Sequence, residues 1–124
     1  MLAATEGHTD IVNVLAGTYN ANVDAVGWSG HTALICAAMD GHTDTVNALA
    51  GTYNANVKAV NMYGTTALMF AARSGHTDTV NALAGTHNAN VEAVDQNGKT
   101  ALMLAATNGH TDTVEALRAL GASR

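Results

Sequence analysis

Cysteine, charge and long apolar runs are all scarce in this chain of 124 residues. One cysteine cannot form a disulfide within the chain, which is typical of a reducing compartment, so we expect an intracellular, cytoplasmic protein. Five basic residues against ten acidic ones argue against a nucleic-acid or anionic-membrane surface, because such surfaces need clustered Lys and Arg. No run approaches the roughly 20 apolar residues of a membrane span, and no basic-then-apolar leader opens the sequence.

Charged residues make up only 12% of the chain and aromatic residues 4%, and Asn, Thr, Ser and His supply much of the polarity. The sequence is dominated by repetition. The motif Gly-His-Thr-Asp begins at Gly7 and returns after 34 residues at Gly41, and again at Gly75 and Gly109. A fixed period in this range is typical of stacked-repeat proteins. It divides the chain into a partial first unit and a second, third and fourth unit: Met1–Val26, Gly27–Val60, Asn61–Val94 and Asp95–Arg124.

The third unit shows the local structure that each unit predicts. Asn61–Gly64 is a turn signal, because its glycine allows a positive φ. Thr66 is the predicted N-cap of a short first helix over Ala67–Arg73. A second helix is predicted from His76-Thr77-Asp78 to Gly85, with the aspartate near the positive end of the helix dipole.

After the second helix we expect a left-handed residue at Asn88, since Asn tolerates that conformation, and an extended return through Val91 and Val94. Neither helix is long enough to be stable alone, because isolated helices become marginal below ~12 residues. Their apolar stripes must therefore be buried against neighbouring units in a linear stack. Pairs of small residues such as Ala71-Ala72 would let the helices approach closely.

One extended pattern recurs in register through the chain. Gly-x-Thr-Ala-Leu-x-x-Ala-Ala-x-x-Gly-His spans Gly30–His42, Gly64–His76 and Gly98–His110, and each copy continues with Val-x-x-Leu. This pattern resembles the ankyrin repeat, and the resemblance covers essentially the whole chain. It implies an all-α solenoid of helix-turn-helix units with hairpin-like finger loops and a concave groove.

Three departures from the ankyrin pattern have structural consequences. Thr-Ala-Leu-Ile or Thr-Ala-Leu-Met replaces Thr-Pro-Leu-His, so the proline favoured at the first helical position is missing. The repeat carries one extra residue, except in the last unit, and we expect it to widen the loop after the second helix, around 17–20, 51–54 and 85–88. The chain begins at Met1-Leu2-Ala3-Ala4, which matches the end of a first helix, and this leaves an uncapped N-terminal end.

No residue pattern indicates chemistry. His8, His42, His76 and His110 would lie roughly 10 Å apart in a stack. Zinc ligands lie about 2 Å from one ion. We predict that each of these histidines ties its loop to a neighbouring unit.

Cys36 aligns with Phe70 and Leu104 at positions predicted to be core. Asn hydroxylation in the ankyrin family would need Asn where Asp24, Lys58 and Glu92 stand. We predict no metal site, no cofactor and no catalysis.

The units differ from one another mainly in the turn and at the end of the first helix, and in the ankyrin architecture these places line the fingers and groove. Trp, Tyr and Met are enriched in interface cores, and Trp, Tyr and Arg dominate binding hot spots. The candidate partner-binding residues are Trp28, Ser29, His31, Met39, Asp40, Met62, Tyr63, Thr65, Arg73, Gln96, Asn97 and Lys99.

We therefore predict a non-enzymatic scaffold that binds a partner protein on this face, with the contacts centred on the second and third units. The alternative is a structural or self-associating module, either a fragment of a longer array or an engineered repeat protein. Such a module would form a homo-oligomer by stacking through its N-terminal end, around Leu2, Val12 and Leu15.

Overall fold

The computed structural model describes residues 24–123, apart from the side chain of Trp28. Most of the first unit lies outside these residues, and with it the predictions made for the N-terminal end around Leu2, Val12 and Leu15. The predicted partner contact of the Trp28 side chain also falls outside what the structure describes.

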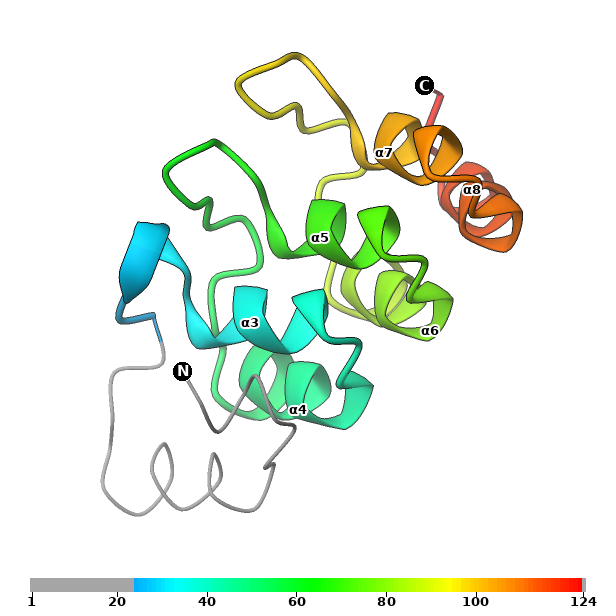
Figure 1. Ribbon diagram of the computed structural model, residues 1–124. Coiled ribbons are helices and arrows are strands. Elements are labelled where there is room, and N and C mark those ends of the chain that lie inside the picture. Colours follow the sequence, from blue (N-terminus) through cyan, green and yellow to red (C-terminus); the bar gives the residue numbers. More distant parts are fainter. Residues whose placement is uncertain (1–23, 124) are drawn as a thin grey trace.

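The described part of the chain contains three pairs of α-helices and no β-strand. Figure 1 shows the pairs stacked in chain order, with the loops before α3, α5 and α7 projecting from the same side of the stack. The predicted all-helical repeat architecture is confirmed. The pairs are α3 (Ala33–Met39) with α4 (Thr43–Asn47), α5 (Ala67–Arg73) with α6 (Thr77–Val80), and α7 (Ala101–Thr107) with α8 (Thr111–Ala119).

A threonine begins the first helix of every described pair, as predicted for Thr66. Its Oγ1 accepts a hydrogen bond from the N–H of Met69 at 3.2 Å, and Thr32 and Thr100 cap their helices in the same way. At α5 the Met69 sulfur also accepts from the Thr66 N–H at 3.5 Å. These caps satisfy N–H groups at the starts of α3, α5 and α7, where the usual proline is missing.

The second helices of the second and third units continue into π-helical segments. These are η3 (Ala48–Thr52), which follows α4, and η4 (Asn81–Thr86), which follows α6. The second helix of the third unit therefore runs one residue past Gly85, where it was predicted to end. In the fourth unit α8 is α-helical throughout.

The π-helical segments contain the extra residue of the longer units. In η4 the carbonyl of Ala82 accepts from the N–H of His87, five residues later, at 3.0 Å. The corresponding carbonyl in the fourth unit, Ala116, accepts from Leu120, only four residues later, at 3.1 Å. One added residue has converted an i→i+4 bond into an i→i+5 bond. The prediction that the insertion widens the following loop is therefore wrong, because the helix absorbs it.

The return to the next unit is not extended throughout. Asn88 has a positive φ of 59°, as predicted. Val91 then enters a turn, because the Asn90 Oδ1 accepts the N–H of Glu92 at 3.0 Å. The predicted extended conformation is therefore wrong at Val91. In the preceding unit Val60 forms an isolated antiparallel bridge with Thr66.

Small side chains hold the first helices together. α5 lies against α3 on one side and α7 on the other, and Ala37, Ala38, Ala71 and Ala72 are fully buried between them. The absence of larger side chains lets these helices pack closely, as predicted. A second, unpredicted contact joins the second helices, where the hydroxyls of Thr43 and Thr79 and those of Thr77 and Thr113 are hydrogen-bonded at 2.8 Å.

The motif histidines His76 and His110 form hydrogen bonds to the preceding unit. The His76 Nε2–H donates to the carbonyl of Met39 at 3.1 Å, and the His110 Nε2–H donates to the carbonyl of Arg73 at 3.1 Å. The prediction that these histidines tie neighbouring units together is confirmed for both. The repeated motif therefore serves the stacking of the units.

Candidate functional site

The finger loops are the tight turns at 27–31, 61–65 and 95–99, each just before a first helix. The middle loop is closed by hydrogen bonds of 3.1 Å from Asn61 N–H to the Thr65 carbonyl and from Gly64 N–H to the Asn61 carbonyl. Neighbouring finger loops are joined through the backbone. The Met62 N–H donates to the carbonyl of Ser29 at 2.9 Å, and a matching bond joins the third loop to the second.

Asn61 connects the first two finger loops through its side chain, which is buried. Its Oδ1 accepts from the N–H groups of Tyr63 at 2.9 Å and Thr65 at 3.0 Å. Two donors fix this oxygen, so the Nδ2–H donates to His31 Nε2 at 3.2 Å. The imidazole is held edge-on to Phe70, with ring centroids 5.5 Å apart and an interplanar angle of 83°. The His31 ring therefore has a fixed orientation at this face.

Asp95 shapes the third finger loop in the same way. Its Oδ1 accepts from the N–H groups of Asn97 at 2.8 Å and Lys99 at 3.0 Å. The first finger loop has Gly27 at this position and lacks such a side-chain acceptor. There Ser29 adopts a positive φ of 59° instead. The loops thus follow one plan with different internal bonding.

A groove of about 460 Å³ opens between the finger loops and the first helices. Phe70 and Met39 are its half-buried apolar side chains, and Tyr63 is an exposed aromatic side chain beside them. Arg73 and Asp95 are the charged members of its lining. The lining residues are Ser29, His31, Met39, Asn61, Tyr63, Thr65, Phe70, Arg73, Asp95, Gln96 and Asn97.

The structure brings most of the sequence-predicted candidates to this groove. Met62 is 64% exposed on the tip of its finger loop and does not line the groove. Asp40 and Lys99 are also exposed and lie outside the lining. The eight candidates that do line it are Ser29, His31, Met39, Tyr63, Thr65, Arg73, Gln96 and Asn97.

Three lining residues, Asn61, Phe70 and Asp95, were not among the candidate partner-binding residues. Phe70 was assigned to the core because it aligns with Cys36, which is indeed buried, but Phe70 itself is only half-buried, as is Leu104. A usable signal was present. The position holds three different side chains in three units, as the other groove positions do.

The described residues offer no metal centre. Within residues 24–123, no group of three or more His, Cys, Asp or Glu side chains is placed to hold a metal ion. In the same residues no helix has both the length and the apolar character to cross a membrane. The groove presents hydrogen-bonding groups, aromatic surface and one cation, which are the features of a recognition surface.

Stacked helix pairs, finger loops joined through their backbones and an open groove define a helical repeat protein. A family model described as "Ankyrin repeats (3 copies)" matches residues 1–95 and 53–123. The chain therefore belongs to the ankyrin repeat family. No curated protein matches it. Ankyrin repeats are generally protein–protein interaction modules, and the family is typically a non-enzymatic scaffold.

Proposed function

We propose that this protein is a non-enzymatic scaffold that binds a segment of another protein in the groove between the finger loops and the first helices. The observation that carries the proposal is where the units differ from one another. The residues that stack the units recur in register, as the threonine pairs and the motif histidines do. The groove positions vary, as in Ser29, Tyr63 and Asn97, which share one position in their finger loops.

This distribution separates two roles within one repeat. A position that only stacks must accept the same neighbour each time, so it keeps its residue. A position that contacts an asymmetric partner meets a different group in each unit and gains nothing from repetition. His31, Thr65 and Lys99 also share one position and differ in size and charge, and two of them line the groove.

The groove favours a partner segment with an apolar side chain next to an acidic one. Phe70 and Tyr63 offer aromatic surface for the apolar side chain, and such burial dominates interface energetics. Arg73 is exposed at the same groove and can pair with a carboxylate in bidentate fashion. The Asp95 Oδ1 accepts two N–H groups of its own loop. Arg73 is the one Lys or Arg side chain in the groove lining, and is therefore the anchor for a partner's carboxylate.

The test uses peptides selected from a displayed random library against the whole chain. We expect Tyr63→Ala to weaken binding of the selected peptides by about 2 kcal/mol or more, a loss of roughly thirtyfold in affinity. The melting temperature of the variant should stay close to that of the parent chain. Trp28→Ala, at the neighbouring finger loop, is expected to have a similar effect. Isothermal titration and thermal melts measure the two quantities.

Met62→Ala is the matched control, because Met62 neighbours Tyr63 in the chain, is even more exposed and lies outside the groove. It should bind the selected peptides as the parent chain does. Equal binding by the parent chain and by both the Tyr63→Ala and Trp28→Ala variants would show that the groove is not the binding face.

A second candidate function is end-to-end self-association, which the uncovered face of the fourth unit favours. Ala38 and Ala72 are completely buried by the following unit, whereas the corresponding Ala106 is exposed. Met103 is likewise more exposed than its buried counterpart Met69. This face repeats the surface on which the other units stack, so a second copy could stack there by its N-terminal end.

Sedimentation over a concentration series tests this second candidate. Self-association predicts a mass that rises with concentration in the parent chain and stays monomeric in Ala106→Glu, which places a charge in the contact. A strict monomer at all concentrations would exclude it, and so would an Ala106→Glu variant that associates as strongly as the parent.

A further inference from the structure

The stacked units are also joined on a face away from the groove, where a carboxylate reaches the next unit. The Asp24 Oδ1 accepts the backbone N–H of Asn56 at 2.9 Å. Two units further along, the Glu92 Oε1 accepts the backbone N–H of Ser123 at 2.9 Å, and its Oε2 accepts the Ser123 Oγ–H at 3.1 Å. Asp24 and Glu92 hold the same register position, so the two contacts are copies of one arrangement.

The junction between the second and third units breaks this arrangement. The register position there is held by Lys58, a cation that cannot accept a hydrogen bond. Asn90 takes the place that Asn56 and Ser123 hold in the other two junctions. Among the described residues, no group accepts the Asn90 backbone N–H. The middle junction thus keeps the donor and has lost the carboxylate.

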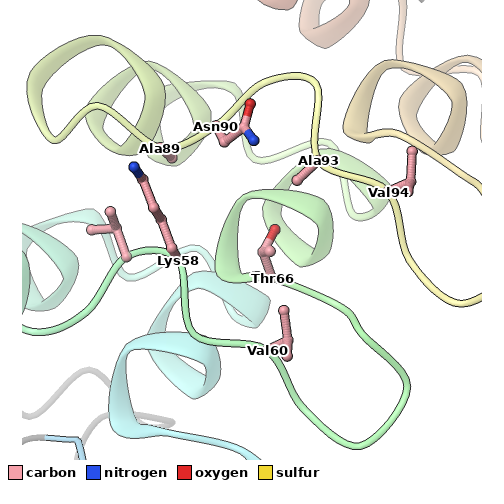
Figure 2. A pocket seen from close by; sticks show the side chains of 8 residues that line it. Lys58, Val60, Thr66, Ala89, Asn90, Ala93 and Val94 are labelled. Atoms are coloured by element: carbon pink, nitrogen blue, oxygen red, sulfur yellow. The ribbon is translucent and has the colours of Figure 1, made fainter.

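A pocket of about 150 Å³ opens at this junction. Figure 2 shows the Lys58 side chain extending toward the loop that carries Ala89 and Asn90. Val60 and Val94, which are 51% and 55% exposed, supply apolar surface. Lys58 is the only charged residue in the lining, which consists of Val57, Lys58, Val60, Thr66, Ala89, Asn90, Ala93 and Val94.

We propose that this pocket binds the side-chain carboxylate of an acidic segment of a partner protein. One carboxylate oxygen accepts the Asn90 N–H, as the Asp24 and Glu92 oxygens do in the neighbouring junctions, and the other pairs with the Lys58 ammonium. The methylene groups of the acidic side chain lie on the exposed valines.

The position of Glu92 supports an external ligand. It is the acidic side chain closest in sequence to Asn90, but both of its oxygens are bonded to Ser123 in the next junction. This site shares no lining residue with the groove between the finger loops. It is therefore a second contact surface, independent of the proposed function.

The test follows the Asn90 backbone amide in ¹⁵N-labelled protein by NMR. The probe is a blocked tripeptide, acetyl-Val-Glu-Val-amide, and the matched control is the same peptide with Gln in place of Glu. We expect a saturable shift of the Asn90 amide with the Glu peptide and a far smaller one with the Gln peptide. No shift at Asn90, or equal shifts with the two peptides, would overturn the proposal.

Lys58→Glu gives a sharper test, because it restores the carboxylate of the other junctions. Lys58 is exposed, so the variant should fold. We expect its own carboxylate to accept the Asn90 N–H, to raise the melting temperature and to abolish the response to the Glu peptide. Lys58→Gln removes the charge without supplying a carboxylate, and it should weaken binding of the Glu peptide several-fold. A Lys58→Glu variant that still binds the Glu peptide like the parent would contradict the proposal.

Discussion

At the scale of single residues, the contact between units is clearest at two glycines. Gly75 has φ +75°, and a Cβ there would lie 2.6 Å from Nδ1 of His110 in the next unit. Gly109 has φ +76°, but a Cβ there would meet nothing within 4 Å among the described residues. The two residues share a backbone conformation and differ in whether a further unit covers them. Substitutions at Gly75 and Gly109 can therefore separate two contributions to the free energy of unfolding: the cost of a side chain in a left-handed backbone, and the cost of disturbing the contact between stacked units.

Alanine substitutions at these glycines should therefore have unequal effects. Gly109→Ala should lower the free energy of unfolding by about 1–2 kcal/mol, the cost of a left-handed non-glycine residue. Gly75→Ala should cost about 1–3 kcal/mol more, because the methyl group would displace the His110 ring and weaken its bond to the Arg73 carbonyl. Urea unfolding of the two variants beside the parent measures the difference, and equal losses would show that the histidine contact adds no stability.

Single residues also show how far the sequence could predict the candidate site. Tyr63, Thr65 and Arg73 were identified because the units differ at these positions, and the structure places all three at one groove. Phe70 was not, because a helical period cannot distinguish a side chain at the edge of the buried stripe from one in its centre. Asn61 was taken as a turn residue, since its bond to His31 depends on the neighbouring finger loop.

At the scale of elements, the second helix contains the extra residue of the longer units. The sequence showed that a residue had been added near this helix, but it did not show that the helix would absorb it. The extra residue of the third unit lies between Ala82 and His87, inside η4, whereas the expected place was the loop after it. Composition offered no way to choose, since Ala82, Leu83 and Ala84 suit either helix. The deciding factor is tertiary. Asn88 must leave the helix where Gly121 does in the shorter unit, so that Ala89 and Ala122 can be buried in the same way.

Removing the extra residue should therefore be tolerated. Deleting Gly51 from η3 places the Tyr53 N–H four positions after the Ala48 carbonyl, the spacing that Leu120 and Ala116 have in the fourth unit. We expect a normal helical spectrum by circular dichroism and a stability equal to the parent's or higher by about 1 kcal/mol, because a helical glycine is lost. A chain that loses cooperative unfolding would show that the π-helical turn is required for stacking.

At the scale of the whole molecule, the repeat period predicted the fold because units this small must stack on one another to bury their apolar side chains. Helices of seven residues such as α3, α5 and α7 are too short to be stable alone, so each unit depends on its neighbours for burial. The family model and the described helices agree with that prediction. The partner could not be predicted, because the same stack can present any side chains on its finger loops.

The central claim is that the groove, where the units differ, is the surface that binds another protein. The most direct measurement is a backbone ¹⁵N spectrum of the chain titrated with a peptide selected against it. The account predicts the largest shifts at Ser29, Tyr63 and Gln96, with those of the second helices, such as Asp78 and Asn81, nearly unchanged. Shifts confined to the second helices, with the finger loops unaffected, would contradict it.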